Sequence, residues 1–304
     1  MVFFYIHYSR RMAKKLIHAG LDRQNNWYQK KGHRLMDPDI FTQSIETNEL
    51  EAEAFFWKLG TVWTVQSQEG LHLQGKVFRQ KESEEKWVIC LHGYRDSGRD
   101  VALIGEEYWN RGFNVLIPDL RAHGESEGQI IGMGWLDRAD LSKWLEKILA
   151  DTPDAKIIFH GVSMGATASM MISGEKLPEQ VKGFIADSGF VSVYAQFDYM
   201  LSKLTKFPKR AILREANKYA KKVAGYSLKQ ASATRQLGSN HLPLLVIHGS
   251  EDKLVPTREA YTAIEATAGE KELCLLEGSV HLAGSTHEIT VYWDRVTKFL
   301  DKIM

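Results

Sequence analysis

The chain has 304 residues, of which 44% are hydrophobic and 25% are charged, a composition typical of globular proteins. Its formal net charge of +1 gives no overall electrostatic attraction to nucleic acid or to acidic partners. The two cysteines, Cys90 and Cys274, lie in apolar runs that favour buried strands, so we expect two reduced core residues. These numbers argue against a nucleic-acid-binding or disulfide-stapled protein and favour one or two domains with a large core.

The first residues form a short apolar and aromatic run that leads into a basic cluster around Arg10 and Lys14. The run is too short to span a bilayer, and a secretory signal would place its charges before the apolar stretch. We expect a helical N-terminal extension over residues 1–59, packed on the surface, with weak contact to a membrane surface as the alternative. We expect a cytoplasmic protein without an integral membrane span; a peripherally associated or anchored form stays open.

From residue 60 to residue 304 the pattern predicts a second, larger domain. Residues 61–67 and 71–80 alternate apolar and polar side chains around Glu69 and Gly70, which indicates an antiparallel hairpin.

Six short apolar runs follow, most of them separated by segments with helical periodicity. One such segment places Leu141, Trp144, Leu145 and Ile148 on one helix face. Unbroken apolar strands that alternate with amphipathic helices indicate a parallel sheet with helices on both faces. In such sheets, ligands bind at the carboxyl ends of the strands. The six runs are WVICLHG, NVLIPDL, KIIFHG, VKGFIADS, PLLVIHG and ELCLLEG.

One connection is long. About fifty residues separate the run that ends near Asp187 from the run that starts at Leu242, whereas most connections have about 2–6 residues. The insert is rich in Lys and Arg and has helical periodicity, so we expect a helical lid at about residues 190–240. Its aromatic and apolar side chains suggest a pocket for an apolar or aromatic acyl group. The candidate residues are Tyr194, Phe197, Tyr199 and Met200 of the insert, together with Tyr94 from outside it.

The main chemical signal is a G-x-S-x-G pattern centred on Ser163. It follows the run KIIFHG directly and precedes a small-residue segment that favours a helix start. This strand–turn–helix setting is typical of a nucleophile elbow, in which glycines let the strand and the helix pass closely. A tight turn with an inert serine is the alternative interpretation. We identify Ser163 as the candidate nucleophile.

A serine hydroxyl needs a base, and in this arrangement the order along the chain is Ser, then acid, then His. Asp252 follows a late apolar run and is the candidate acid, with Glu251 and Asp187 as competitors. His281 follows the last run and is the candidate base. His287 is the competing histidine, but it lies in a predicted capping box that opens the C-terminal helix, which limits its reach.

Two backbone N–H groups must stabilise the oxyanion of an acyl-transfer reaction. We assign them to Met164, the residue after the nucleophile, and to Tyr94, which follows His92 and Gly93 after an early strand. His92 precedes the serine in the chain, so we interpret it as a structural histidine.

The segment 118–126 carries Asp119, Arg121 and His123 and resembles a second site. We interpret it instead as a loop held by internal Asp–Arg and His hydrogen bonds. The sequence contains no zinc-binding H-E-x-x-H pattern, no paired cysteines and no phosphate-binding glycine pattern, so it implies neither a metal nor a cofactor.

Together these motifs resemble the α/β-hydrolase superfamily, and more narrowly a branch of serine carboxylesterase-like hydrolases common in Gram-positive bacteria. The resemblance covers about residue 63 to the C-terminus and implies a mostly parallel eight-stranded sheet flanked by helices. In this family a Tyr of the last helix follows the final His at a fixed distance, and Tyr292 gives that register to His281. Ala122 departs from the family, which usually has Gly there. The motifs are LHGY at 91–94, DLRAHGESEG at 119–128, GVSMG at 161–165, HGSEDKLVP at 248–256 and GSVHLAGSTHE at 278–288.

The sequence therefore predicts a serine hydrolase that cleaves small-molecule carboxylic esters through an acyl-enzyme. An amidase or small-peptide hydrolase with the same residues is the first alternative. A catalytically silent binding protein on the same scaffold is the second.

Overall fold

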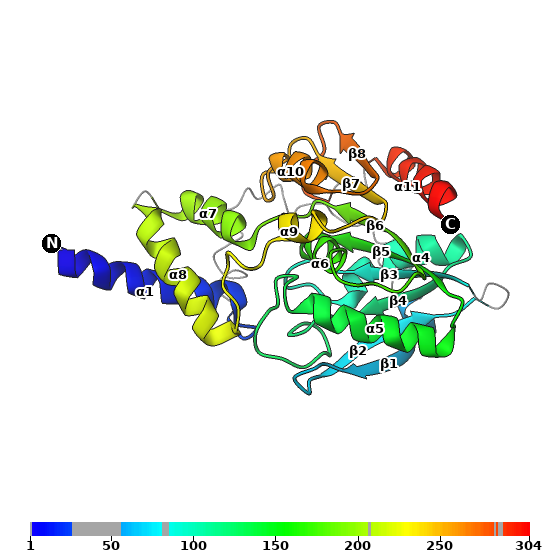
Figure 1. The fold of residues 1–304 in the computed structure, drawn as a ribbon, viewed down its shortest axis with the longest axis horizontal. Helices are drawn as coiled ribbons and strands as arrows, with labels where there is room; N and C mark the ends of the chain where they lie inside the picture. Colours follow the sequence, from blue (N-terminus) through cyan, green and yellow to red (C-terminus); the bar gives the residue numbers. More distant parts are fainter. Residues whose placement is uncertain (1, 26–55, 81–84, 206–207, 283, 285–287) are drawn as a thin grey trace.

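The computed structural model describes residues 2–25, 56–80, 85–205, 208–282, 284 and 288–304. The described helices and strands alternate along most of the chain (Figure 1). The strands are β1 (Thr61–Gln66), β2 (His72–Phe78), β3 (Lys86–Leu91), β4 (Asn114–Pro118), β5 (Lys156–Val162), β6 (Val181–Asp187), β7 (Leu244–Gly249) and β8 (Lys271–Leu276). The helices are α1 (Val2–Leu21), the 3-10 helix η3 (Gly98–Val101), α4 (Ala102–Asn110), α5 (Asp137–Asp151), α6 (Met164–Ile172), α7 (Val193–Leu204), α8 (Lys209–Ala224), α9 (Ala233–Leu237), α10 (Arg258–Ala266) and α11 (Ile289–Ile303).

The eight strands form one sheet in the order β1-β2-β4-β3-β5-β6-β7-β8. The predicted hairpin is confirmed, because β1 pairs antiparallel with β2. Strand β2 also pairs antiparallel with β4, and all the remaining neighbours are parallel. The predicted eight-stranded, mostly parallel sheet is therefore confirmed.

Helices cover both faces of the sheet, which explains why its inner strands are largely buried and mostly apolar. All five residues of β4 and all six of β7 are buried. One core lies under α5, α6 and α10 and contains the predicted helix face of Leu141, Trp144, Leu145 and Ile148. The other core lies under α4 and α11. Both cysteines are free, as expected; Cys90 is buried in β3 and Cys274 is half-buried in β8.

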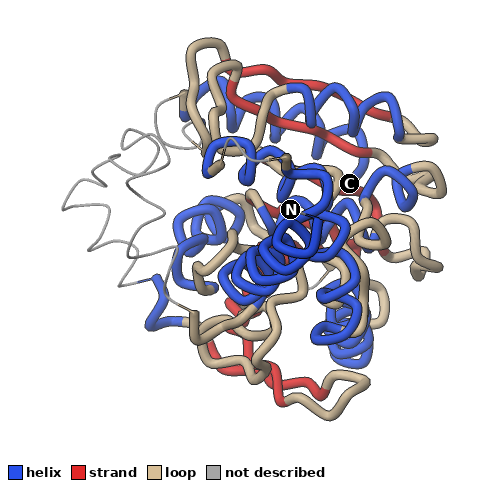
Figure 2. The backbone as a smooth tube through the Cα atoms, turned by 90° about the vertical axis from the view of Figure 1, so that its left-hand side faces the viewer, coloured by secondary structure: helices blue, strands red, loops and turns tan. Residues whose placement is uncertain are grey.

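Helices α7, α8 and α9 all lie in the long connection between β6 and β7. Helix α1 packs along α8, and the two helices project from one end of the sheet (Figures 1 and 2). They share the core under α5 and α6, since Ala13 and Ile17 of α1 and Ile212 and Ala216 of α8 belong to it. The N-terminal helix and the long connection between β6 and β7 thus lie side by side.

Within the described residues, no helix combines the length and the apolar character needed to cross a bilayer. Helix α1 has 20 residues, but Arg10, Arg11, Lys14 and Lys15 interrupt its apolar sequence.

Candidate active site

The turn between β5 and α6 holds Ser163. Strand β5 ends at Val162 and α6 begins at Met164, so Ser163 is the single residue between them. Its backbone has a φ of 52°, a conformation that is strained for a residue with a side chain. Ser163 N–H donates to the carbonyl oxygen of Asp187 at the end of β6 (2.8 Å), which fixes the turn against the neighbouring strand.

The two glycines of the G-x-S-x-G pattern lie where no side chain fits. A Cβ on Gly161 would lie 2.2 Å from the carbonyl oxygen of Gly165. A Cβ on Gly165 would lie 2.2 Å from the carbonyl oxygen of Leu91 at the end of β3. Backbone oxygens cannot move away as flexible side chains do, so the close passage of helix and strands requires glycine at both positions.

Ser163, His281 and Asp252 form one hydrogen-bonded line across three loops at the strand ends. His281 Nε2 lies 3.0 Å from Ser163 Oγ, and His281 Nδ1 lies 2.6 Å from Asp252 Oδ2. All three residues are buried, at 6–8% exposure. A carboxylate only accepts, so His281 Nδ1 carries the proton and donates to Asp252. That leaves Nε2 to accept the hydrogen bond from the Ser163 hydroxyl.

The electrostatic surroundings keep Asp252 ionised. Its Oδ1 accepts from the N–H groups of Leu254 and Val255, both at 2.8 Å. Burial raises the pKa of this carboxyl, but His281 and His248 outweigh that effect and hold the pKa well below its ordinary range. Asp252 can therefore orient His281 and stabilise its protonated form.

His248, the last residue but one of β7, is a neighbour of the acid that the sequence analysis missed. Its Nε2 lies 2.9 Å from the carbonyl oxygen of Val255 and 3.2 Å from Asp252 Oδ2. Both partners are acceptors, so Nε2 carries a proton and points it at them. The only signal in the sequence was the position of His248 before Gly249 at the end of an apolar run.

The carboxylate of the competing acid Asp187 has other partners. Asp187, at the end of β6, accepts hydrogen bonds from Ser188 Oγ (2.8 Å) and from the Tyr292 hydroxyl (3.0 Å). Tyr292 in turn accepts from His160 Nε2 at 2.8 Å, and His160 Nδ1 accepts from the Tyr108 hydroxyl at 2.9 Å. This buried network occupies Asp187 and was not visible in the sequence.

Glu251, the other competitor, is exposed, while Asp252 beside it is buried. The competing base, His287, lies outside the described residues. Helix α11 begins at Ile289 with Glu288 at its N-cap, and the other residues of the predicted capping box lie outside the described residues.

The backbone after β3 passes next to the nucleophile. A Cβ on Gly93 would lie 3.5 Å from Ser163 Cβ, which brings the following residue, Tyr94, to the site. Met164 is the first residue of α6, where a backbone N–H has no partner within the helix. The two backbone groups assigned to an oxyanion hole thus belong to segments that flank Ser163.

The side chain of Tyr94 ties this loop to the N-terminal helix. Its hydroxyl lies 3.0 Å from the carbonyl oxygen of Gly20 and 3.2 Å from that of Ala19, at the end of α1. Arg95 donates to the Tyr94 hydroxyl and to the carbonyl oxygens of Ala19 and Asp22. These donors satisfy carbonyl groups that the last turn of a helix leaves unpaired.

A further carboxyl that the sequence analysis missed, Asp96, lies beside Gly93. A Cβ on Gly93 would lie 2.4 Å from Asp96 Oδ2, so the carboxyl and Ser163 flank the same glycine. Burial, with a smaller contribution from the charge of Asp100, raises the pKa of Asp96 to about 7.

The prediction of an internal Asp–Arg pair in the loop after β4 is wrong. Arg121 donates through Nε and Nη2 to both carboxylate oxygens of Asp140 in α5, at 2.6 and 2.8 Å. Asp119 instead accepts from the N–H groups of Gly98 and Glu125. Arg121 Nη1 also donates to Glu69 Oε2 at 2.7 Å, so carboxylates from outside the loop satisfy this buried guanidinium.

The two histidines of this region accept hydrogen bonds from backbone N–H groups. His92 accepts from Leu120 N–H through Nε2 (3.0 Å), and His123 accepts from Arg95 N–H through Nε2 (3.1 Å). Burial lowers the pKa of His92 to about 4 and that of His123 to about 3. Ala122, where the resembling family has Gly, adopts a φ of 62°, so it keeps the backbone conformation of a glycine.

The candidate pocket residues of the insert lie on α7 but do not share one environment. The ring of Phe197 is buried against Gly20 of α1. The Tyr199 hydroxyl donates to the carbonyl oxygen of Lys253 at 2.8 Å, beside the acid loop. Tyr194 and Met200 are half-buried. Among the described residues, no group of His, Cys, Asp and Glu has the arrangement of a metal site.

Comparison with known proteins gives a consistent fold assignment. Residues 82–229 match the family described as serine aminopeptidase, S33. The uncharacterized protein YqkD of Bacillus subtilis is 26% identical over 268 residues, which are 88% of this chain and 88% of that protein. The uncharacterized protein YfhR of Escherichia coli K12 is 23% identical over 250 residues, 78% of this chain and 81% of that protein.

Solved structures share the fold at low sequence identity. The Pyrococcus furiosus esterase Pf2001 superposes with a TM-score of 0.65 at 22% identity, over 81% of this chain and 91% of that one. The alpha/beta hydrolase GrgF of Penicillium gives a TM-score of 0.62 at 15% identity, over 81% and 99% of the two chains. Acetyl xylan esterase 1 of Thermoanaerobacterium gives 0.59 at 14% identity, over 82% and 92%.

Proposed function

We propose that this chain, which has the α/β-hydrolase fold, is a serine hydrolase of that superfamily that cleaves carboxylic esters through an acyl-enzyme. The observation that carries the proposal is the line of hydrogen bonds from Ser163 Oγ through His281 to Asp252. A base that a buried carboxylate orients is the arrangement that activates a serine hydroxyl.

In the first half of the reaction, Ser163 Oγ attacks the ester carbonyl carbon while His281 Nε2 takes the hydroxyl proton. Asp252 stabilises the imidazolium that forms. The N–H groups of Tyr94 and Met164 donate to the oxyanion of the tetrahedral intermediate. His281 then returns the proton to the leaving alcohol, and the acyl group stays bonded to Ser163.

In the second half, His281 takes a proton from a water molecule, whose oxygen attacks the acyl carbon. The same N–H groups stabilise the second oxyanion, and the proton passes to Ser163 Oγ as the carboxylic acid leaves. No step needs a metal or a cofactor.

We propose residues 1–59 as an N-terminal extension, residues 60–304 as the catalytic domain and the insert at about 190–240 as its lid. Helix α7 supports this assignment, because Gln196 donates to the carbonyl oxygen of Leu254 and Tyr199 to that of Lys253, in the loop that follows Asp252. The aromatic side chains of α7 favour a small-molecule ester with an apolar or aromatic acyl group.

Covalent labelling tests the proposal. A fluorophosphonate should label the wild-type protein, and mass spectrometry should locate the adduct on the peptide that contains Ser163. The Ser163→Ala variant should not be labelled. Ser97→Ala is the matched control, because Ser97 lies on the same sheet edge and caps η3 without contacting His281. A folded wild-type protein that stays unlabelled, or equal labelling of Ser163→Ala, contradicts the mechanism and favours a binding protein.

The description of the matched family as serine aminopeptidase favours a second candidate, an amidase or small-peptide hydrolase. Both functions use the same residues, so only the leaving group separates them. A panel of p-nitrophenyl esters graded by acyl length and aromaticity, set against aminoacyl p-nitroanilides, distinguishes them by kcat/KM. We expect the esters to be turned over faster; a preference for the anilides assigns the second function.

A further inference from the structure

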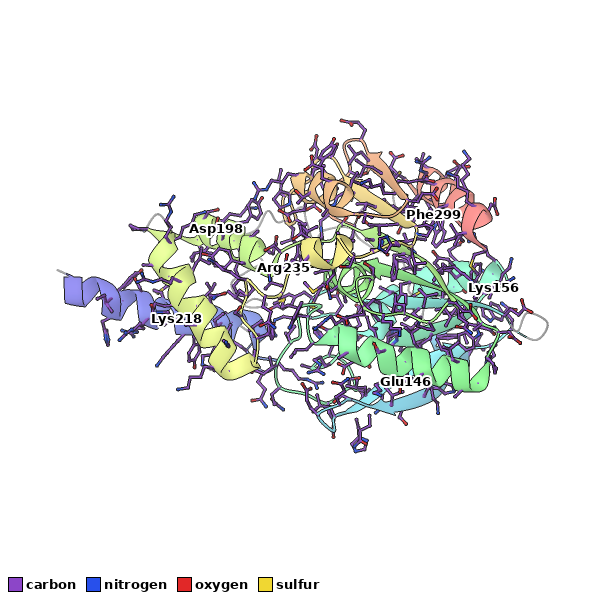
Figure 3. The ribbon with its side chains drawn as sticks, in the orientation of Figure 1. Glu146, Lys156, Asp198, Lys218, Arg235 and Phe299 are labelled. Carbon is purple, nitrogen blue, oxygen red and sulfur yellow. The ribbon has the colours of Figure 1, made fainter. Side chains whose placement is uncertain are left out.

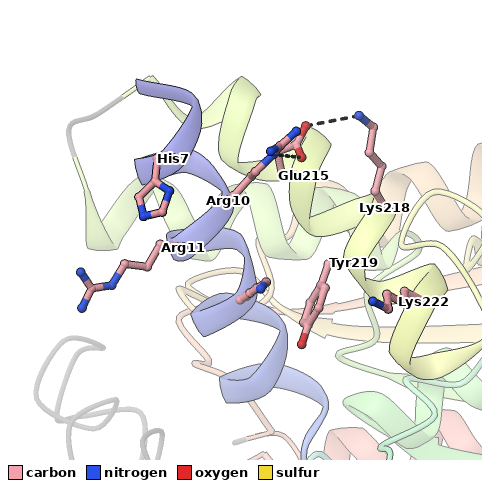
Figure 4. Close-up of a pocket in the computed structure, with 8 residues that line it drawn as sticks. His7, Arg10, Arg11, Glu215, Lys218, Tyr219 and Lys222 are labelled. Atoms are coloured by element: carbon pink, nitrogen blue, oxygen red, sulfur yellow. Dashed lines mark hydrogen bonds and ion pairs between the residues drawn. The ribbon is translucent and has the colours of Figure 1, made fainter. Parts of the chain in front are cut away.

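A cavity of about 490 Å³ lies between α1 and α8, and no residue of the Ser163 site lines it (Figure 4). Its volume is in the range of small-molecule sites in proteins. Basic side chains from both helices surround it. They are His7, Arg10, Arg11, Lys14, Lys218 and Lys222.

Positive charge in this cleft is far from balanced. Among the residues that the structure describes, the five Arg and Lys side chains of the lining face one carboxylate, that of Glu215, although the whole chain has a net charge of only +1. Glu215 lies 3.5 Å from Arg10 and 3.3 Å from Lys218, so it is already shared between two of the cations. Like charges held this close repel one another, and an anion between them relieves the repulsion.

The cleft is held by folded elements. Ala13 and Ile17 of α1 and Ala216 and Ala220 of α8 are buried in a common core. Lysines spaced four residues apart on α8, Lys218 and Lys222, therefore present their charges along the face toward α1. Lys218 lies beside α1, at the end of the molecule opposite Lys156 of β5 (Figure 3).

Tyr219 adds a polar and aromatic wall between the two helices. Its hydroxyl lies 3.0 Å from His18 Nε2, and the Lys14 ammonium lies 5.8 Å from the centre of its ring. Figure 4 shows Tyr219 beside Lys222 of α8, while Arg10, Glu215 and Lys218 meet further along the cleft. Cations from both helices thus line one cleft that is open to solvent.

We propose that this cleft binds a ligand that presents two or more negative charges on phosphate. A guanidinium such as that of Arg10 matches two phosphate oxygens at once, and lysine ammonium groups add point charges around them. A single carboxylate would leave most of the positive charge uncompensated. Soluble phosphate esters and phospholipid headgroups share this chemistry.

Binding of two probes tests the proposal and separates these sources. Isothermal titration calorimetry measures the affinity of the full chain for inorganic pyrophosphate. Co-sedimentation measures its affinity for phosphatidylcholine vesicles with and without phosphatidic acid, whose phosphomonoester can carry two negative charges. Binding of pyrophosphate identifies a soluble ligand, and binding only to the anionic vesicles identifies a lipid headgroup. Because Ser163→Ala protein serves equally well, the result does not depend on the proposed function.

A matched pair of variants shows whether the cleft is responsible. Lys14→Glu/Lys222→Glu reverses two lining charges, while Lys15→Glu/Lys221→Glu makes the same change on the same helices outside the lining. The first should weaken binding by about tenfold or more, and the second by less than about twofold. Both should keep the melting temperature of the wild type. The proposal is overturned if neither probe binds at physiological ionic strength, or if both variants weaken binding equally.

Discussion

The site at the strand ends and the cleft between α1 and α8 place polar groups in opposite ways. Around Ser163 the polar side chains are buried, and His281 and Asp252 have defined hydrogen-bond partners. In the cleft the cations Lys218 and Lys222 are exposed and outnumber their counter-charges. Hydrogen bonds therefore fix the positions of the side-chain atoms around Ser163, which suits the breaking and forming of bonds. The cleft concentrates charge without fixing geometry and suits ion binding.

Removal of the proposed base should have the largest effect. His281→Ala should lower kcat by about 10⁶-fold, because neither proton transfer can then occur at Ser163. His287→Ala, the control, should change kcat by less than about twofold. Steady-state kinetics on the best ester of the panel measures both variants. A large loss of kcat in His287→Ala would show that His281 is not the base and that His287 is.

Replacement of the proposed acid should rank second. Asp252→Asn keeps the shape but removes the charge that orients His281, so kcat should fall by about 10⁴-fold. Glu251→Gln makes the same chemical change at the exposed neighbouring position and should leave kcat near that of the wild type. An equal loss of kcat in the two variants would contradict the assignment of Asp252 as the acid that orients His281.

The packing of the turn that holds Ser163 can be tested without changing a side chain of the proposed triad. Gly165→Ala places a Cβ against the carbonyl oxygen of Leu91 and should destabilise the fold by about 3 kcal/mol. Gly238→Ala is the control, because a Cβ there meets no atom closer than 3.4 Å and the backbone is right-handed helical. Urea denaturation measures both free energies of unfolding; similar values would show that the elbow is not tightly packed.

The buried network under the site should make stability depend on pH. Burial lowers the pKa of His160 from 6.5 to about 3, so below pH 6.5 the unfolded chain takes up a proton that the folded chain does not. Between about pH 7.5 and about pH 5 this residue should cost the wild type about 2 kcal/mol of unfolding free energy. His160→Gln cannot titrate and should lack that loss. Urea denaturation at both pH values measures the free energy of unfolding of each protein. An equal loss in the wild type and in His160→Gln would contradict the prediction.

Substitutions in the cleft between α1 and α8 should have the smallest effect on stability. Lys14→Glu/Lys222→Glu exchanges exposed side chains, so the free energy of unfolding should change by no more than about 0.5 kcal/mol, in contrast to Gly165→Ala. The same denaturation experiment measures it. A loss of several kcal/mol would mean that these lysines hold α1 and α8 together.

Local patterns predicted much of this molecule from sequence. The hairpin of β1 and β2, the six apolar runs and the buried face of α5 all follow from periodicity, which depends on neighbouring residues only. The order of the strands does not: β4 lies between β2 and β3, which no local pattern encodes. The predicted partner of Arg121 is wrong for the same reason: its actual partner, Asp140, belongs to a helix outside the loop.

The candidate site shows the same division. The G-x-S-x-G pattern and the order of Ser163, Asp252 and His281 along the chain identify these residues without any knowledge of distances. Only the tertiary structure revealed His248 beside the acid and the network of Asp187, because these contacts join strands and helices that are distant in sequence. The cleft between α1 and α8 likewise needed both helices folded, since its charge density arises from residues about 200 positions apart. Sequence determines what chemistry the side chains carry, and packing of the hydrophobic core decides which of them meet.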